Sequence, residues 1–235
     1  TTGRPKGIKR PLQGVPFGTR EPSFDLITSL YQMHEDTVYL SPAPLYHAAP
    51  LRFNMNMQTL GATSIIMERF DAEAALALIG KHRVTHSQWV PTMFVRMLKL
   101  PDDVRLGYDI SSMEVAIHAA APCPVPVKEQ MIAWWGPKIF EYYAGTEVNG
   151  YCAIDSATWL ERKGSVGQAM IGTLHIMDED GNALPTGEAG TIFFADGNPF
   201  EYHNDPEKTA QSRNPMGWTT LGDVGYVDSD DYLYL

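Results

Sequence analysis

Apolar residues along the chain repeat with two different periods. Short runs rich in β-type residues lie at 37–40, 62–67, 84–89, 112–118 and 138–143. Segments with helical spacing alternate with them at 23–33 (with Ser23 as N-cap), 47–60, 71–82, from Pro91 onward and at 125–135. Repeated strand–helix–strand order implies parallel strands joined by crossover helices, so this part of the chain is predicted to be an α/β layer structure.

The pattern changes near residue 164, where glycines become frequent. Short β runs at 174–177, 190–194 and 225–235 are separated by turns such as Asp180-Gly181-Asn182. We therefore predict two subdomains: a parallel-sheet α/β layer over residues 1–160, and a small antiparallel, barrel-like β subdomain over 161–235.

Composition narrows the class of protein. The 235 residues are 44% hydrophobic and 20% charged, as in ordinary globular proteins. A net charge of −10, from 28 acidic and 18 basic residues, argues against nucleic acid as a partner. No apolar run reaches the roughly 20 residues that span a bilayer. Cys123 and Cys152 form neither a disulfide framework nor a metal-ligand spacing, a pattern typical of a reducing compartment. We therefore expect the protein in the cytoplasm, and peripheral contact with a membrane stays open.

Two segments carry candidate chemistry. Residues 1–7 (TTGRPKG) combine hydroxyls, glycines and a lysine, which suits a loop around phosphate oxygens, although a solvated basic turn fits them equally well. Residues 142–147 (YYAGTE) follow a predicted strand, and ligands collect beyond the carboxyl ends of parallel strands. There Thr146 can meet phosphate and Glu147 can hold Mg²⁺, but a tyrosine core pair followed by a capped turn is the competing interpretation.

The order of these motifs resembles the adenylate-forming superfamily of acyl-CoA ligases, firefly luciferase and peptide-synthetase adenylation domains. The resemblance rests on six segments: 1–7 (TTGRPKG), 44–47 (PLYH), 119–122 (AAAP), 143–147 (YAGTE), 164–167 (GSVG) and 217–223 (GWTTLGD). Their order and their spread along the chain make a chance match improbable, and fatty-acyl-CoA ligases look most similar.

The resemblance implies a role for each matching position. Catalytic residues would be His47, between the acyl pocket and the pantetheine channel, Thr146 and Glu147, with Glu147 also the metal ligand. Residues that bind the nucleotide would be Thr1, Thr2, Gly3, Lys6, Ala120, Ala121, Tyr143 and Asp223, of which Asp223 binds the ribose. Residues of the acyl pocket would be Trp89, Met93 and Gly145, although residues 89–97 are equally well explained as a helix packing on the sheet.

The implied reaction uses ATP, Mg²⁺ and coenzyme A. The substrate carboxylate attacks the α-phosphorus, pyrophosphate leaves, and CoA thiolate then attacks the acyl-adenylate, leaving AMP and acyl-CoA. The sequence departs from the family at Ala119 and in the Ala144-Gly145 order, which narrows the adenine-side loop and alters the floor of the acyl pocket.

The resemblance also leads us to expect a fragment. The phosphate-loop motif normally begins earlier, and the chain stops before the family's hinge and its C-terminal domain with a catalytic lysine. We therefore expect little or no turnover from the isolated chain, and self-association through apolar surface that the parent protein covers. A carrier-protein acylase, an amino-acid adenylation domain and a nucleotide-binding module without turnover remain as alternative functions. Fatty, aromatic and steroid side-chain acids all remain candidate substrates.

Overall fold

The computed structural model describes residues 6–11, 14–16, 19–20 and 22–235. Contacts group the chain into two compact units, each discontinuous in sequence. The α/β unit comprises Val15–Glu141 and Asp155–Lys163. The β-rich unit comprises Tyr142–Ile154, Gly164–Leu235 and the described residues within Thr1–Gly14. The segment at 142–154 therefore groups with the C-terminal part of the chain, whereas the predicted division near residue 160 stays a prediction.

A parallel sheet forms the centre of the α/β unit. Its strand order is β3 (Thr63–Ile66), β2 (Val38–Ser41), β4 (His86–Trp89), β5 (Val115–His118) and β6 (Ile139–Tyr143). Adjacent strands pair in parallel; Leu40, for example, lies opposite Ile65 on one side and Ser87 on the other. The parallel core predicted from the strand–helix alternation is confirmed.

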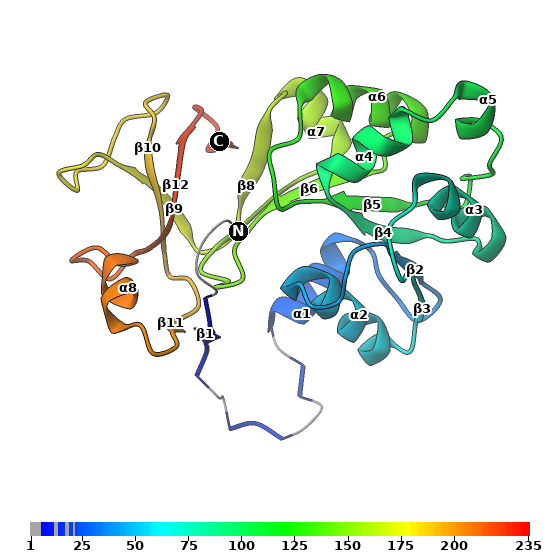
Figure 1. Ribbon diagram of the computed structural model, residues 1–235. Helices are drawn as coiled ribbons and strands as arrows, with labels where there is room; N and C mark the ends of the chain where they lie inside the picture. Colours follow the sequence, from blue (N-terminus) through cyan, green and yellow to red (C-terminus); the bar gives the residue numbers. More distant parts are fainter. Residues whose placement is uncertain (1–5, 12–13, 17–18, 21) are drawn as a thin grey trace. The chain divides into compact units, whose positions relative to one another are not determined.

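Helices cover both faces of this sheet. They are α1 (Pro22–Leu30), α2 (Ala48–Leu60), α3 (Ala72–His82), α4 (Pro91–Leu98), α5 (Asp102–Arg105), α6 (Val125–Trp135) and α7 (Ser156–Glu161). Figure 1 shows α1 and α2 on one face of the strands, and α4 and α6 on the other. This coverage explains why β4 is buried along its whole length although it contains His86, Ser87 and Gln88. The His86 ring is accommodated because its nitrogens lie 2.8 Å from the Tyr31 carbonyl and 2.8 Å from the Thr85 hydroxyl.

The β-rich unit is antiparallel. Its strands run in the order β7 (Tyr151–Ile154), β8 (Ser165–Ile171), β13 (Leu233–Tyr234), β12 (Thr219–Val227), β10 (Gly190–Ala195) and β9 (Thr173–Met177). A separate pair joins β1 (Ile8–Lys9) to β11 (Glu201–Tyr202), and α8 (Pro206–Gln211) follows β11. Gly167 has a φ of 99°, and a Cβ there would lie 1.9 Å from the Ala153 carbonyl oxygen. Only glycine fits this crossing of β7 and β8, which accounts for the last residue of the GSVG segment. Closure of the unit into a barrel stays a prediction.

Two sequence predictions need correction. Helix α1 begins at Pro22, so Ser23 lies in the first turn and is not the N-cap; its hydroxyl accepts a hydrogen bond from Arg52 instead. The predicted β run at 225–235 is interrupted, because Asp228 accepts hydrogen bonds from the backbone of Asp230 and Tyr232 and closes a tight turn. Among the residues that the structure describes, no helix is long and apolar enough to cross a membrane.

Candidate functional site

A hydrogen bond joins two of the sequence motifs within the β-rich unit. Tyr143 ends β6, Asp223 lies in β12, and the Tyr143 hydroxyl donates to the Asp223 carboxylate at 2.7 Å. Burial, followed by the hydrogen bond to Asp223, raises the pKa of Tyr143, so the phenol stays protonated and acts as the donor. The Asp223 side chain is exposed, so its remaining lone pairs face solvent and can accept further hydrogen bonds.

A second tyrosine–carboxylate pair involves Glu147. Glu147 is only 5% exposed, and its Oε1 accepts a hydrogen bond of 2.7 Å from the Tyr202 hydroxyl. Tyr202 is 6% exposed, and burial together with Glu147 raises its pKa. The neighbouring Thr146 is exposed. The predicted metal ligand is therefore a buried carboxylate held by a neutral donor.

Gly145 provides space for this carboxylate. A Cβ at Gly145 would lie 2.6 Å from Leu221 Cδ1 and 2.7 Å from Glu147 Oε2, which is closer than nonbonded atoms approach. The backbone here turns sharply, with the Val148 N–H donating to the Gly145 carbonyl at 3.1 Å. In the structure, the absence of a side chain at Gly145 leaves room for the Glu147 carboxylate. The predicted place of Gly145 in the acyl pocket stays a prediction.

The donor set around Glu147 fits one kind of metal ion. The described residues contain no group of three or more His, Cys, Asp or Glu side chains that could hold a metal. Mg²⁺, however, commonly binds through one or two carboxylates together with substrate phosphates and water. Glu147 therefore fits an ion that arrives with a nucleotide.

Two lysines approach the ring of Tyr202. The Nζ atoms of Lys6 and Lys208 lie 5.7 Å and 5.3 Å from its centroid, within the range of cation–π attraction. The Tyr202 strand also pairs with the segment after Lys6, and the His203 N–H donates to the Gly7 carbonyl at 2.7 Å. Lys6 thus lies near Tyr202, the donor to Glu147, whereas the predicted phosphate-loop residues Thr1, Thr2 and Gly3 lie outside the described residues.

Other predicted site residues belong to the α/β unit. His47 is exposed at the N-terminus of α2, with its ring 4.5 Å from that of Tyr46. Ala120 and Ala121 are exposed in the loop after β5, and Ala120 has a φ of 77°. Positive φ is unusual for alanine, so the local fold constrains this loop. The roles predicted for all three stay predictions.

Trp89 and Met93 are core residues of the α/β unit. Trp89 is 1% exposed, and its ring packs edge-on against Trp135 at 5.7 Å. Met93, on α4, is 7% exposed. The structure therefore shows the packing role, and their contribution to an acyl pocket stays a prediction.

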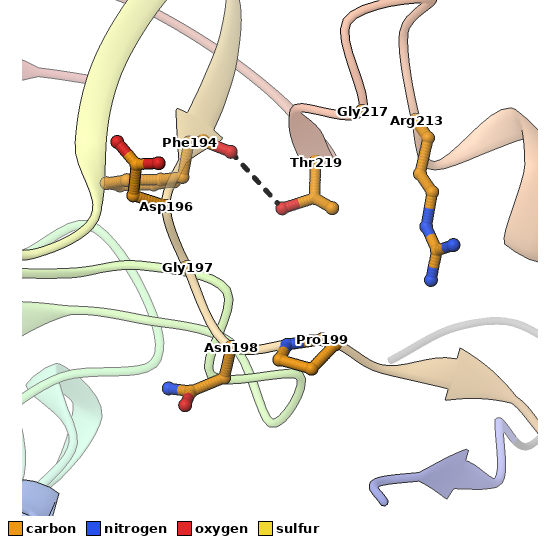
Figure 2. A pocket seen from close by; sticks show the side chains of 8 residues that line it. All are labelled: Phe194, Asp196, Gly197, Asn198, Pro199, Arg213, Gly217 and Thr219. Atoms are coloured by element: carbon orange, nitrogen blue, oxygen red, sulfur yellow. Dashed lines mark hydrogen bonds between the residues drawn. The ribbon is translucent and has the colours of Figure 1, made fainter.

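The β-rich unit also contains a cavity of about 230 Å³. Figure 2 shows Phe194 and Asp196 on one side and Arg213 on the opposite side, with Thr219 donating to the Phe194 carbonyl at 3.5 Å. The remaining lining residues are Gly197, Asn198, Pro199 and Gly217. No residue that we predicted for the site lines this cavity.

The α/β unit contains a buried ion pair that the sequence pattern did not predict. Lys128 on α6 is 0% exposed and donates to Glu141 on β6 at 2.6 Å, and its Nζ lies 4.6 Å from the Trp159 ring centroid. His118 Nε2 lies 3.5 Å from the same carboxylate. We regard His118 as neutral, because burial and the Lys128 charge hold its pKa well below the usual value.

A signal for this pair existed in the sequence. Lys128 lies on the same helical face as Met131, Ile132 and Trp135, where a charge needs a buried partner. Near it, Cys123 is a free thiol whose pKa is raised to about 12, chiefly by burial. Tyr202 was also missed, and the reason is that its two-residue strand has no periodicity to detect.

Comparison with known proteins places these motifs in a family. Residues 1–201 match the family of AMP-binding enzymes. The chain is 31% identical to 4-coumarate–CoA ligase 2 of Solanum tuberosum, and 30% identical to the 4-coumarate–CoA ligase of Pinus taeda. The alignments cover 100% of this chain but 44% and 45% of those relatives, so the chain spans less than half their length.

Solved structures of related enzymes share the fold of this chain. The o-succinylbenzoate CoA synthetase of Bacillus subtilis, in complex with its acyl-adenylate intermediate, matches with a TM-score of 0.80 at 25% identity, over 99% of this chain and 46% of that one. ATP-bound MatB of Rhodopseudomonas palustris matches with a TM-score of 0.76 at 26% identity, over 90% of this chain and 42% of that one.

Proposed function

Because the chain belongs to the family of AMP-binding enzymes, adenylate-forming proteins that include CoA ligases, we propose that it carries the nucleotide site of an ATP-dependent acyl-CoA ligase. The whole protein would join a carboxylic acid to CoA through an acyl-adenylate, with release of AMP and pyrophosphate. The relatives at about 30% identity that are named as CoA ligases support this choice over carrier-protein acylation and amino-acid adenylation.

The observation that carries the proposal is the contact between Tyr143 and Asp223. These residues are 80 positions apart, and both belong to motifs of the family. The Tyr143 ring offers a face for a purine, and the exposed Asp223 carboxylate offers acceptors for the two hydroxyls of a ribose. By holding Asp223 from one side, the Tyr143 hydroxyl would fix the direction in which its free oxygens point.

Phosphate recognition is assigned to the neighbouring turn. The exposed Thr146 hydroxyl would donate to a phosphate oxygen, and Lys6 would supply a positive charge. Glu147 would hold Mg²⁺, which neutralises phosphate charge when bound. These groups would position the α-phosphorus for the carboxylate, and catalysis of this kind rests on orientation and charge stabilisation.

The acid and the thiol are assigned from the family and from local chemistry. We propose an acid with an apolar acyl group, and CoA entry near His47. The relatives are named for 4-coumarate and o-succinylbenzoate, so aromatic acids are the first to test, followed by fatty acids. A cytoplasmic location fits these soluble co-substrates.

Calorimetric titration with AMP and with ATP·Mg²⁺ tests the proposal. Asp223→Ala should lower the affinity for both nucleotides about tenfold or more, because it removes charged hydrogen-bond acceptors. Glu188→Ala, which removes an exposed acid of the same unit, is the matched control and should leave both affinities unchanged. Equal binding by wild type and Asp223→Ala would contradict the assignment. A requirement of the whole protein for CoA would separate it from an enzyme that loads a carrier protein.

A further inference from the structure

We propose that Tyr202 is a positioning residue, whose hydroxyl holds the Glu147 carboxylate in place to receive the Mg²⁺ that accompanies ATP. No sequence motif pointed to Tyr202. The inference deepens the proposed function and rests on it.

The contact is short and almost completely shielded from water. The Tyr202 hydroxyl and Glu147 Oε1 are 2.7 Å apart, a distance typical of a hydroxyl donating to a carboxylate, and both side chains are at most 6% exposed. A buried carboxylate without a donor is strongly disfavoured, so the hydroxyl has a structural reason to be present. It also uses only one of the two carboxylate oxygens, since Oε2 points towards the space at Gly145.

The chemistry of the donor matters as much as its position. A lysine at this place would neutralise Glu147 and compete with a metal ion for it. A phenol donates a hydrogen bond but carries no charge, so it does not offset the charge of a carboxylate as a lysine would. Partners of this kind behind a metal ligand orient the ligand and sustain its affinity for the metal.

Tyr202 is itself held firmly. Its backbone N–H donates to the Thr209 hydroxyl at 2.9 Å, and it lies opposite Ile8 in the β1–β11 pair. The Lys6 and Lys208 ammonium groups lie within 5.7 Å of its ring centroid. The side chain that orients Glu147 is therefore part of the same local structure that places Lys6.

The test is Tyr202→Phe in the full 235-residue chain. This variant removes the hydroxyl and keeps the ring that packs against the lysines. Calorimetric titrations use ATP with Mg²⁺, ATP with EDTA, and AMP. Affinity for ATP·Mg²⁺ should fall about tenfold to a hundredfold, the range seen when the partner of a metal ligand is removed. Affinity for AMP and for metal-free ATP should be unchanged. Tyr226→Phe, an exposed tyrosine of the same unit, is the control and should change none of the three.

A double-mutant cycle separates positioning from a general structural role. If Tyr202 acts through Glu147, adding Tyr202→Phe to Glu147→Gln should cause no further loss of ATP·Mg²⁺ affinity. Losses that multiply, equal losses for AMP, or an unchanged metal dependence would each overturn the inference while leaving the proposed function intact. A wild-type chain that binds no ATP would overturn the proposed function, and this inference with it.

Discussion

Two glutamates of this chain are equally buried but differently partnered. Glu141 and Glu147 are each 5% exposed, and each accepts one hydrogen bond shorter than 3 Å. In the α/β unit the donor to Glu141 is the ammonium of Lys128, whereas in the β-rich unit the donor to Glu147 is the hydroxyl of Tyr202. Glu141 therefore has a cationic partner, while Glu147 has a neutral one.

This difference separates a charge that serves folding from one that is available to a ligand. Burial raises the pKa of Glu141, and Lys128 opposes that rise. The buried carboxylate is thus stable only together with its lysine. The Lys128 ammonium takes the place that another cation would occupy. Glu147 has a neutral hydrogen-bond donor, so its carboxylate can accept a metal cation.

The largest effect is expected from breaking the ion pair. Lys128→Met would leave the Glu141 carboxylate buried without a cation and would also remove the contact with Trp159. Loss of one partner of a buried pair costs about 3–5 kcal/mol. Urea denaturation of wild type and variant measures the change in the free energy of unfolding. A loss below about 1 kcal/mol, the range for exposed pairs, would show that the pair is not the structural element described here.

A smaller effect is expected from filling the space beside Glu147. Gly145→Ala would place a methyl group against Leu221 and Glu147 Oε2. Overpacking of this kind lowers the free energy of unfolding by about 1–3 kcal/mol. Displacement of the carboxylate should also weaken the affinity for ATP·Mg²⁺ more than the affinity for AMP. Denaturation and calorimetry on the same sample check both parts. An unchanged free energy of unfolding in Gly145→Ala, with no change in ATP·Mg²⁺ affinity, would contradict the steric explanation.

Acid should weaken the α/β unit through His118. Its folded-state pKa is held well below 6.5 by burial and Lys128, whereas the unfolded chain binds a proton near pH 6.5. The unfolded state therefore binds more protons below that pH, so the free energy of unfolding should fall as the pH drops from 7 to 5. One such histidine contributes at most about 1.4 kcal/mol per pH unit.

His118→Gln tests this assignment. The free energy of unfolding should depend less steeply on pH, by the amount that corresponds to the uptake of about one proton on unfolding. Burial also lowers the pKa of His86, so this histidine should account for the pH dependence that remains. An unchanged slope would show that His118 titrates normally in the folded protein.

The smallest effect is expected at an exposed pair of the same kind. Lys163 and Glu129 are also 2.6 Å apart, but their side chains are 48% and 38% exposed. Lys163→Met should cost no more than about 1 kcal/mol, because solvent screens exposed pairs. Since distance and chemistry match the Lys128–Glu141 pair, equal losses in the two variants would show that burial does not set the difference.

Sequence patterns predicted the parts of the molecule that depend on local order. The parallel strands follow from alternating periods, and Tyr143, Glu147 and Asp223 were predicted as site residues because they lie in motifs. Tyr202 was not predictable in this way, since its role depends on a fold that brings a two-residue strand beside residue 147. Lys128 and Glu141 lie on different elements, so only the presence of a charge on an apolar helix face hinted at the pair.

Glu147→Gln, with unfolding and nucleotide binding measured on the same sample, tests whether Glu147 serves a metal ion or the fold. The glutamine can still accept from Tyr202, and burial of a charge is relieved, so the free energy of unfolding should stay within about 1 kcal/mol of wild type. Affinity for ATP·Mg²⁺ should fall at least about tenfold, while affinity for AMP is retained. A loss of stability like that of Lys128→Met, with ATP·Mg²⁺ binding unchanged, would show that Glu147 serves folding as Glu141 does and does not hold the metal ion.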